Sequence, residues 1–175
     1  MRFRPLATGV SSPVSWNLSF NELADSAGNV LSNVAYTNGS LTVQPAPSIA
    51  VGNAAGCVGS SVSVPVSINS SCPVGAISLT MPYNASILTY TGFNSALGVI
   101  NDSNLTVNAA NGNIYISWFG YPAVTPSGNL LNLNFNVLSA GNASISVNAS
   151  ASEIANGMAT AYSGVTYASG VVTAT

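Results

Sequence analysis

The sequence has very few ionisable side chains. Among 175 residues there are two arginines, Arg2 and Arg4, and four carboxylates, with no lysine and no histidine. Without histidine or lysine the usual activated serine and cysteine nucleophiles cannot be built, and a zinc site loses its commonest nitrogen ligand. A formal net charge of −2 gives no basic footprint for nucleic acid. We therefore expect no enzyme, no metal, no cofactor and no nucleic-acid partner.

Long hydrophobic runs are also missing. No apolar stretch approaches the roughly 20 residues of a membrane span, and the start MRFRPLATG lacks the apolar segment of a signal peptide. Only 3% of residues are charged, so serine, threonine, asparagine and glycine must keep the surface polar. This composition is typical of exported β-proteins. We expect no membrane span and an extracellular or cell-surface location, with any signal peptide outside this sequence.

Cysteine is scarce, with only Cys57 and Cys72. In an oxidising compartment they are candidates for a disulfide. The strand-like run 60–68 lies between them and extends over about 25 Å, whereas bridged Cα atoms lie within about 7 Å. A bridge therefore needs both flanking loops to fold back over that strand. Two free thiols or an interchain bridge are the alternatives.

Alternation of apolar and polar residues dominates the rest of the chain. It predicts half-buried strands separated by turns rich in glycine, proline and asparagine, and no convincing helix. Pro65, inside one run, predicts an edge strand or a bulge. Many short antiparallel strands predict an all-β sandwich. The clearest runs are 62–68, 77–81, 114–118, 131–137, 145–147 and 165–167.

The beginning and the end of the chain repeat each other. A shift of 131 residues places Glu22 on Glu153 and Gly39 on Gly170 without a gap, and it also aligns Val34, Tyr36 and Thr42 with identical residues. Internal repeats of this kind indicate a modular array. We predict that residues 1–45 are the C-terminal strands of a preceding module and that residues 46–175 are one complete module of the same kind. The proline-containing stretch 44–47 is the predicted linker.

The complete module resembles the cohesin domain. The resemblance lies in SVSVPVSI (61–68), VGAISLTMPYNASILTY (74–90), GNIYISWF (112–119) and LLNLNFNV (130–137), and the family's terminal strand resembles VAYTNGSLTV (34–43). The cysteines around the second strand resemble a variant found in tandem repeats of large bacterial surface proteins. The resemblance implies a jelly-roll sandwich of about nine strands. Cohesins of cellulosomes bind dockerins, but Tyr83-Asn84 stands where the family often has Tyr-Asp.

Two functions follow as expectations. The first is a structural or adhesive module in a tandem array or self-assembling surface filament, in which residues 1–45 donate strands to other copies or to neighbouring repeats. The second is a recognition module that binds a dockerin-like domain or a carbohydrate. The first needs only complementary edges, whereas the second needs a cluster of anchor side chains on the surface.

The aromatic cluster Trp118, Phe119 and Tyr121 is the candidate contact for a partner or a glycan. The other interpretation is that these side chains seal one end of the sandwich. Sequons of the Asn-x-Ser/Thr type are candidate N-glycosylation sites, or simply a product of the polar composition. They occur at Asn17, Asn38, Asn69, Asn84, Asn101, Asn104, Asn142 and Asn148.

Overall fold

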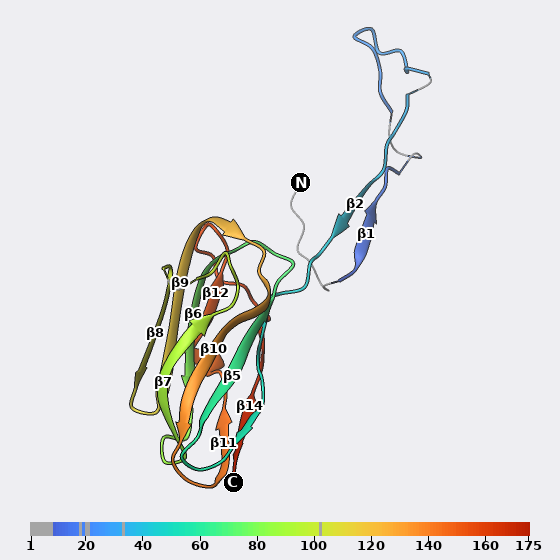
Figure 1. Cartoon of the computed structure of the whole chain (residues 1–175). Coiled ribbons are helices and arrows are strands. Elements are labelled where there is room, and N and C mark those ends of the chain that lie inside the picture. Colours follow the sequence, from blue (N-terminus) through green and yellow to red (C-terminus); the bar gives the residue numbers. More distant parts are fainter. Residues whose placement is uncertain (1–8, 18, 20–21, 33, 102) are drawn as a thin grey trace. The chain divides into compact units, whose positions relative to one another are not determined.

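A computed structural model of the chain describes residues 9–17, 19, 22–32, 34–101 and 103–175. It divides the chain into two units, Met1–Pro45 and Ala46–Thr175. Both consist of strands and turns, as the period-two alternation predicts, and the 3-10 turn η1 (Ala149–Ala151) is the sole helical element among the described residues (Figure 1).

Unit 2 contains twelve strand segments. They are β3 (Ser48–Val51), β4 (Ala54–Gly56), β5 (Ser61–Asn69), β6 (Val74–Pro82), β7 (Leu88–Ser95), β8 (Leu105–Ala110), β9 (Asn113–Val124), β10 (Ser127–Val137), β11 (Gly141–Ile145), β12 (Glu153–Ala155), β13 (Thr166–Ala168) and β14 (Gly170–Ala174).

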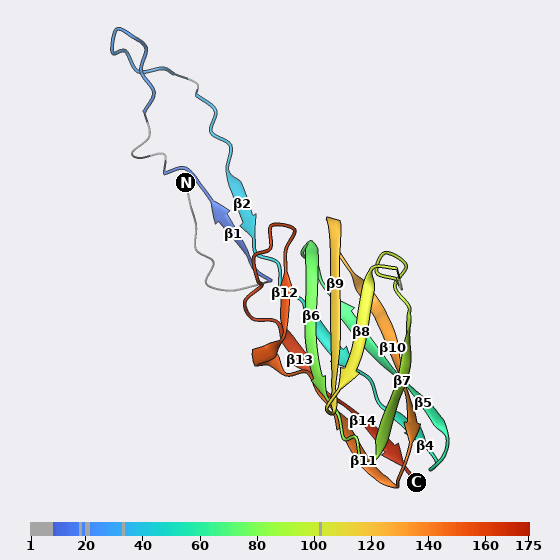
Figure 2. The same ribbon diagram turned by 90° about the vertical axis from the view of Figure 1, so that its left-hand side faces the viewer.

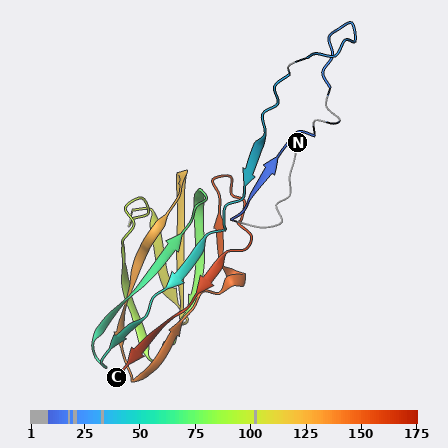
Figure 3. The same cartoon turned by 90° about the vertical axis from the view of Figure 1, so that its right-hand side faces the viewer.

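These segments form two packed layers (Figure 2). One layer is the four-stranded sheet β12-β6-β9-β8; the other contains the sheet β13-β3-β5-β10-β7 and the smaller sheet β11-β14-β4. Three strands are interrupted: β3 continues into β4, β13 into β14, and β11 into β12. The last of these passes from one layer to the other, because β11 pairs with β14, Ile145 at its end bridges to Tyr83 after β6, and β12 pairs with β6. Counting each pair once gives the predicted nine strands. The first and last strands lie side by side in parallel, β13 with β3 and β14 with β4 (Figure 3).

The core lies between the layers and is built by alternation. In β5 the buried residues are Val62, Val64, Val66 and Ile68, and β6, β9 and β10 alternate in the same way. Phe135 is fully buried, with the rings of Tyr83 and Tyr90 at 5.4 and 5.9 Å. Each such side chain contributes about 1.5–3 kcal/mol on burial, so unit 2 has the core of an independent domain.

Pro65 does not mark an edge strand, because β5 lies between β3 and β10. The β3 ladder ends at the pair Val51–Val66, and Pro65 is the residue of β5 just beyond this last pair. There the chain leaves the sheet at Gly52, whose N–H donates to the Pro65 carbonyl at 2.8 Å. The missing proline N–H therefore falls where pairing stops, which lets a proline occupy an interior strand.

The predicted Cys57–Cys72 disulfide is not formed. Cys57 precedes β5 and Cys72 follows it, so all nine residues of that strand separate them. At about 3.3 Å per residue the strand holds its two ends far beyond bridging distance. The carbonyl of Cys57 is held in a turn, where it accepts from the N–H and the hydroxyl of Ser60. The loop does not fold back over the strand.

The described residues of unit 1 form a two-stranded sheet of β1 (Ser11–Val14) and β2 (Gly39–Thr42), labelled in Figure 1. Its four residue pairs, from Ser11–Thr42 to Val14–Gly39, become pairs of the β11–β14 ladder when 131 is added to each number. The same shift converts the bridge Ala24–Val30 into the bridge Ala155–Ala161. Unit 1 thus has the strand register of the end of unit 2.

The turns repeat as well. Asp25 accepts through Oδ1 from the N–H groups of Ala27 and Asn29, and Asn156 accepts likewise from residues 158 and 160. The third residue after each has a positive φ, 83° at Gly28 and 56° at Ala159. These are short-range contacts, so the repeated turn residues are sufficient to produce them twice.

Candidate partner-binding face

Strand β9 is central to the four-stranded sheet and presents aromatic side chains outward. Ile114, Ile116 and Trp118 point into the core, so the intervening residues face solvent. Among these, Tyr115 is 43% exposed, Phe119 72% and Tyr121 88%. Large apolar side chains this exposed, in a module with a well-buried core, are typical of contact anchors.

The neighbouring strands surround these aromatics with mainly polar side chains. Across β6, Thr80 pairs with Tyr115, Ser78 with Ser117 and Ala76 with Phe119; across β8, Asn108 pairs with Tyr115 and Thr106 with Ser117. Glu153 of β12 lies opposite Ser78 and is exposed. We call these outward residues of β6, β8, β9 and β12 the β9 face. Glu153 is the one charged side chain that they include.

The predicted aromatic cluster is divided between the two sides of the sheet. Trp118 is 3% exposed and seals the core, whereas Phe119 and Tyr121 face outward. Trp118 is therefore not available as a surface platform. Strand alternation alone separates them, because residues 114, 116 and 118 share one face. The same reasoning identifies Tyr115, which the sequence analysis missed.

A shallow hollow of about 500 Å³ lies at the end of the β9 face. Its walls are the loop containing Val99, Asn101 and Asn104 and the last part of β9, including Phe119 and Tyr121. Trp118 also borders the hollow, but its indole N–H is buried and has no acceptor in the described part of the chain. Phe119 and Tyr121 are therefore the aromatic rings that a ligand in the hollow could contact.

Several of the candidate glycosylation asparagines serve in turns. Asn17, Asn84, Asn101 and Asn148 each accept through Oδ1 from the N–H of the serine two residues on. Asn38 accepts from the N–H of Trp16, Asn104 from that of Asn101, and Asn69 from the Ser127 hydroxyl. Asn142 is exposed on β11. Glycosylation of these residues remains a prediction.

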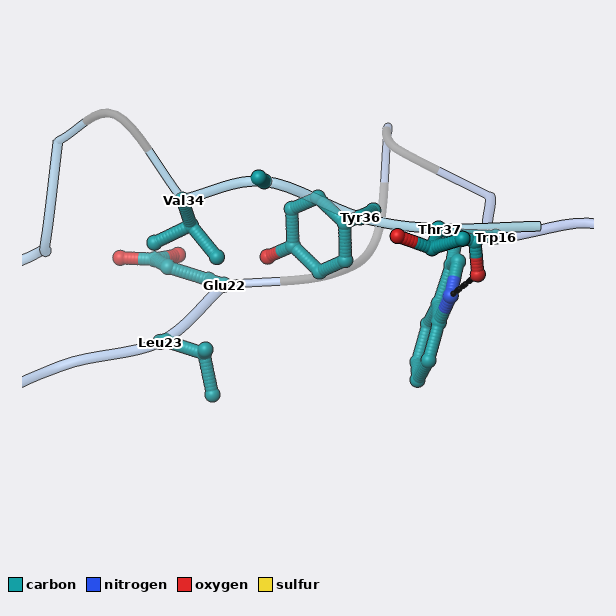
Figure 4. A pocket seen from close by; sticks show the side chains of 7 residues that line it. Trp16, Glu22, Leu23, Val34, Tyr36 and Thr37 are labelled. Carbon is teal, nitrogen blue, oxygen red and sulfur yellow. Dashed lines mark hydrogen bonds between the residues drawn. The ribbon is translucent and has the colours of Figure 1, made fainter.

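Unit 1 contains a second opening, a groove of about 390 Å³ (Figure 4). Trp16 and Tyr36 lie at one end with ring centroids 5.5 Å apart, and the Trp16 indole N–H donates to the Thr37 carbonyl at 3.1 Å. Glu22, Leu23 and Val34 line the remainder. A shift of 131 turns Glu22, Leu23, Val34 and Tyr36 into Glu153, Ile154, Val165 and Tyr167.

Metal and membrane sites are not evident in the part of the chain that the structure describes. No three of its histidine, cysteine or carboxylate side chains gather into a cluster that could hold an ion. Nor does it include a helix of the length and apolarity needed to cross a bilayer. Asp102, one of the four carboxylates, lies outside the described residues.

Comparison with known proteins identifies the fold. The family model of the cohesin domain matches residues 47–174. The Clostridium acetobutylicum cohesin CaCohA2, in a complex with CaDoc0917, is 25% identical, with a TM-score of 0.68 over 74% of this chain and 99% of that chain. No curated protein sequence matches the chain.

Two further solved structures share the fold. The sixth cohesin of Acetivibrio cellulolyticus scaffoldin B, in complex with the Cel5 dockerin, is 22% identical, with a TM-score of 0.64 over 74% of this chain and 99% of that one. A non-cellulosomal cohesin from the archaeon Archaeoglobus fulgidus is 19% identical, with a TM-score of 0.64 over 74% and 91%. The predicted jelly-roll sandwich is confirmed.

Proposed function

This chain belongs to the cohesin family, and on that premise we propose that unit 2 is a recognition module that binds a dockerin-like domain through the β9 face. The observation that carries the proposal is the exposure of Phe119 and Tyr121 beside a sheet surface of hydroxyl and amide groups. Buried aromatic anchors surrounded by polar groups are the usual make-up of protein interfaces. The cohesin of scaffoldin B was determined with a bound dockerin, which supports a partner of this class.

The chemistry of the face defines the kind of partner. Since Glu153 is its one charged side chain, binding would depend on apolar burial and hydrogen bonds rather than on ion pairs. We expect the affinity to change little between low and roughly molar salt, because screening acts on charges. The matching dockerin surface would be apolar at its centre and equally poor in charge.

Calorimetric titration of the full chain with a panel of dockerins tests this function. Phe119→Ala should weaken binding about 30-fold, the effect of losing roughly 2 kcal/mol at an interface anchor. Leu138→Ala is the matched control, because Leu138 is also half exposed but follows β10, away from the face. Equal affinity of Phe119→Ala and wild type would place the contact elsewhere, and failure of every dockerin to bind would reject the partner class.

A carbohydrate is the other ligand that the β9 face could hold. The hollow beside Phe119 and Tyr121 combines aromatic rings with the amides of Asn101 and Asn104. Aromatic rings stack on apolar faces and amides bond hydroxyl groups. Binding to a glycan array, lost in Tyr121→Ala and kept in Leu138→Ala, would favour this ligand over a dockerin.

A second role, as a structural or adhesive unit of a tandem array or surface filament, is supported by the repeat between units 1 and 2. It includes strand donation between copies, because unit 1 carries strands without a complete sandwich. Both roles would place the protein outside the cell or on its surface. Light scattering over roughly a hundredfold range of concentration distinguishes strand donation from a covalent tandem array. Strand donation between copies predicts polymers that grow with concentration, whereas a covalent array predicts that this chain is a monomer. No catalytic role is proposed.

A further inference from the structure

The last strands of unit 2 pair with strands near the beginning of the same module, which we call its front strands. β14 pairs with β4, β13 with β3 and β12 with β6, so three closing segments each have a neighbour from residues 48–82. Their counterparts in unit 1 are residues 39–42, 35–37 and 22–24. Within the described residues, β2 pairs with β1 alone, and the other two segments form no ladder with a front strand. Unit 1 has three open strand edges.

The same counterparts differ in burial. Ile145, Ile154 and Val172 are all 0% exposed in unit 2. Their equivalents Val14, Leu23 and Leu41 are 37%, 51% and 39% exposed. The hydrogen bonds of the two regions agree while the burial of their apolar side chains does not, so no covering layer lies on Val14, Leu23 and Leu41 among the residues that the structure describes.

Gly39 provides a second, independent argument that a layer of strands belongs on unit 1. Its equivalent Gly170 lies against the backbone of Gly52, where any Cβ would collide with the Gly52 carbonyl oxygen. A Cβ on Gly39 would meet no atom within 4 Å, and Gly39 is not among the residues with a positive φ. No described residue of unit 1 therefore requires glycine at residue 39. A strand packed on Gly39 in the way that Val51 and Gly52 pack on Gly170 would require it.

The groove of Figure 4 also results from the uncovered apolar face of unit 1. In unit 2 the equivalents of three apolar or aromatic lining residues contact the core: Ile154 belongs to it, and Val165 and Tyr167 pack against it. Glu153, the equivalent of Glu22, is exposed. The groove is therefore the open half of a core rather than a pocket shaped for a small molecule.

We propose that residues 9–43 are the closing strands of another cohesin module and that their apolar face binds the front strands of that module. The occupant is a polypeptide with the strand pattern of residues 46–140, joined directly ahead of this segment in the same protein. It would supply counterparts of β3, β4 and β6 to the three open edges. The inference deepens the array role proposed above and is independent of dockerin binding.

A second copy of the chain fits this face less well. The front strands of every copy already bury their own Ile145, Ile154 and Val172. Replacing these with Val14, Leu23 and Leu41 of a neighbour gains no burial. It also gives up an intramolecular contact, whose effective concentration is on the order of millimolar.

Hydrogen exchange on an extended chain tests the proposal. In the extended chain, a copy of residues 46–140 takes the place of residues 1–9 and is joined directly to Val10. Val10 is the equivalent of Gly141, so this junction reproduces the step from residue 140 to residue 141. We expect the amides of residues 34–43 to exchange at least about 100-fold more slowly than in the unextended chain. Gly39→Ala should abolish this protection in the extended chain, and Ser40→Ala, an exposed neighbour, should retain it.

A second format uses the unextended chain with the 46–140 polypeptide added separately, and protection of residues 34–43 again supports the proposal. Unchanged exchange of residues 34–43 in both formats, with residues 46–175 still protected, overturns it. Protection that appears in the unextended chain alone and rises with concentration, together with a dimeric mass, also overturns it in favour of a second copy. Dockerin binding by unit 2 is measured separately, so its failure is distinguishable.

Discussion

Residues 9–43 and 141–174 form the same ladder, the same bridge and the same turns, yet one set lies on a core and the other is open. The turn hydrogen bonds of Asp25 and Asn156 span two to four residues, so they depend on the local sequence alone. Burial of Ile154 or Val172 depends on strands about 80 to 120 residues away. The local sequence therefore specifies the turns and the strand register, whereas burial requires strands from distant parts of the sequence.

A buried charge should produce the largest difference between the two regions. Val172→Asp places a carboxylate in the core of unit 2 and should destabilise it by about 4 kcal/mol or more. Leu41→Asp, at the equivalent position, should change the melting of unit 2 by less than about 0.5 kcal/mol. Thermal unfolding of both variants gives the comparison, and equal destabilisation would mean that Leu41 is buried after all.

A single methyl group should give the next largest difference. Gly170→Ala forces a Cβ against the Gly52 carbonyl and should cost about 1–3 kcal/mol in unit 2, as overpacking does. Gly39→Ala meets open space and should be neutral in the 175-residue chain. Denaturant unfolding followed by tyrosine and tryptophan fluorescence measures both, and a loss of stability in Gly39→Ala would show that a neighbour already contacts residue 39.

Acid should have a small effect on one of the two turns. The hydrogen bonds from Asn29, side chain first and backbone second, followed by those from Ala27 and Gly28, lower the pKa of Asp25 below its ordinary 3.8. The ionised carboxylate therefore stabilises the turn at pH values above 3.8, and this contribution disappears as the pH falls through the lower folded pKa. Asn156 does not titrate, so the equivalent turn should not respond.

Amide shifts of residues 27–29, followed by NMR during acidification, measure this effect against those of residues 158–160. Asp25→Asn is the control, because it gives unit 1 the asparagine of the equivalent turn and should remove the pH dependence. A response of the same size at residues 158–160 would indicate general unfolding instead.

Alternation predicted much of the sandwich, because one-sided burial imposes a period of two on β5, β6, β9 and β10. It is also sufficient to place Trp118 and Phe119 on opposite sides of the sheet, because they are adjacent residues of β9. The position of Pro65 was not predictable, because it depends on where the β3 ladder ends. The strand between Cys57 and Cys72 was predicted, but whether the loops at its two ends fold back to join the cysteines was not. The repeat indicated which residues correspond, but it did not predict that Leu23 and Leu41 are exposed, because burial depends on strands that are distant in the sequence.

Hydrogen exchange on the unmodified 175-residue chain tests most directly whether the two regions share hydrogen bonds but not burial. Amides of residues 142–145 and 170–174 should exchange at least about a thousandfold more slowly than those of residues 11, 12, 14 and 39–43, because opening the former requires unfolding of unit 2. Equal protection of the two sets in a monomeric sample would contradict the account, since unit 1 would then have a core of its own.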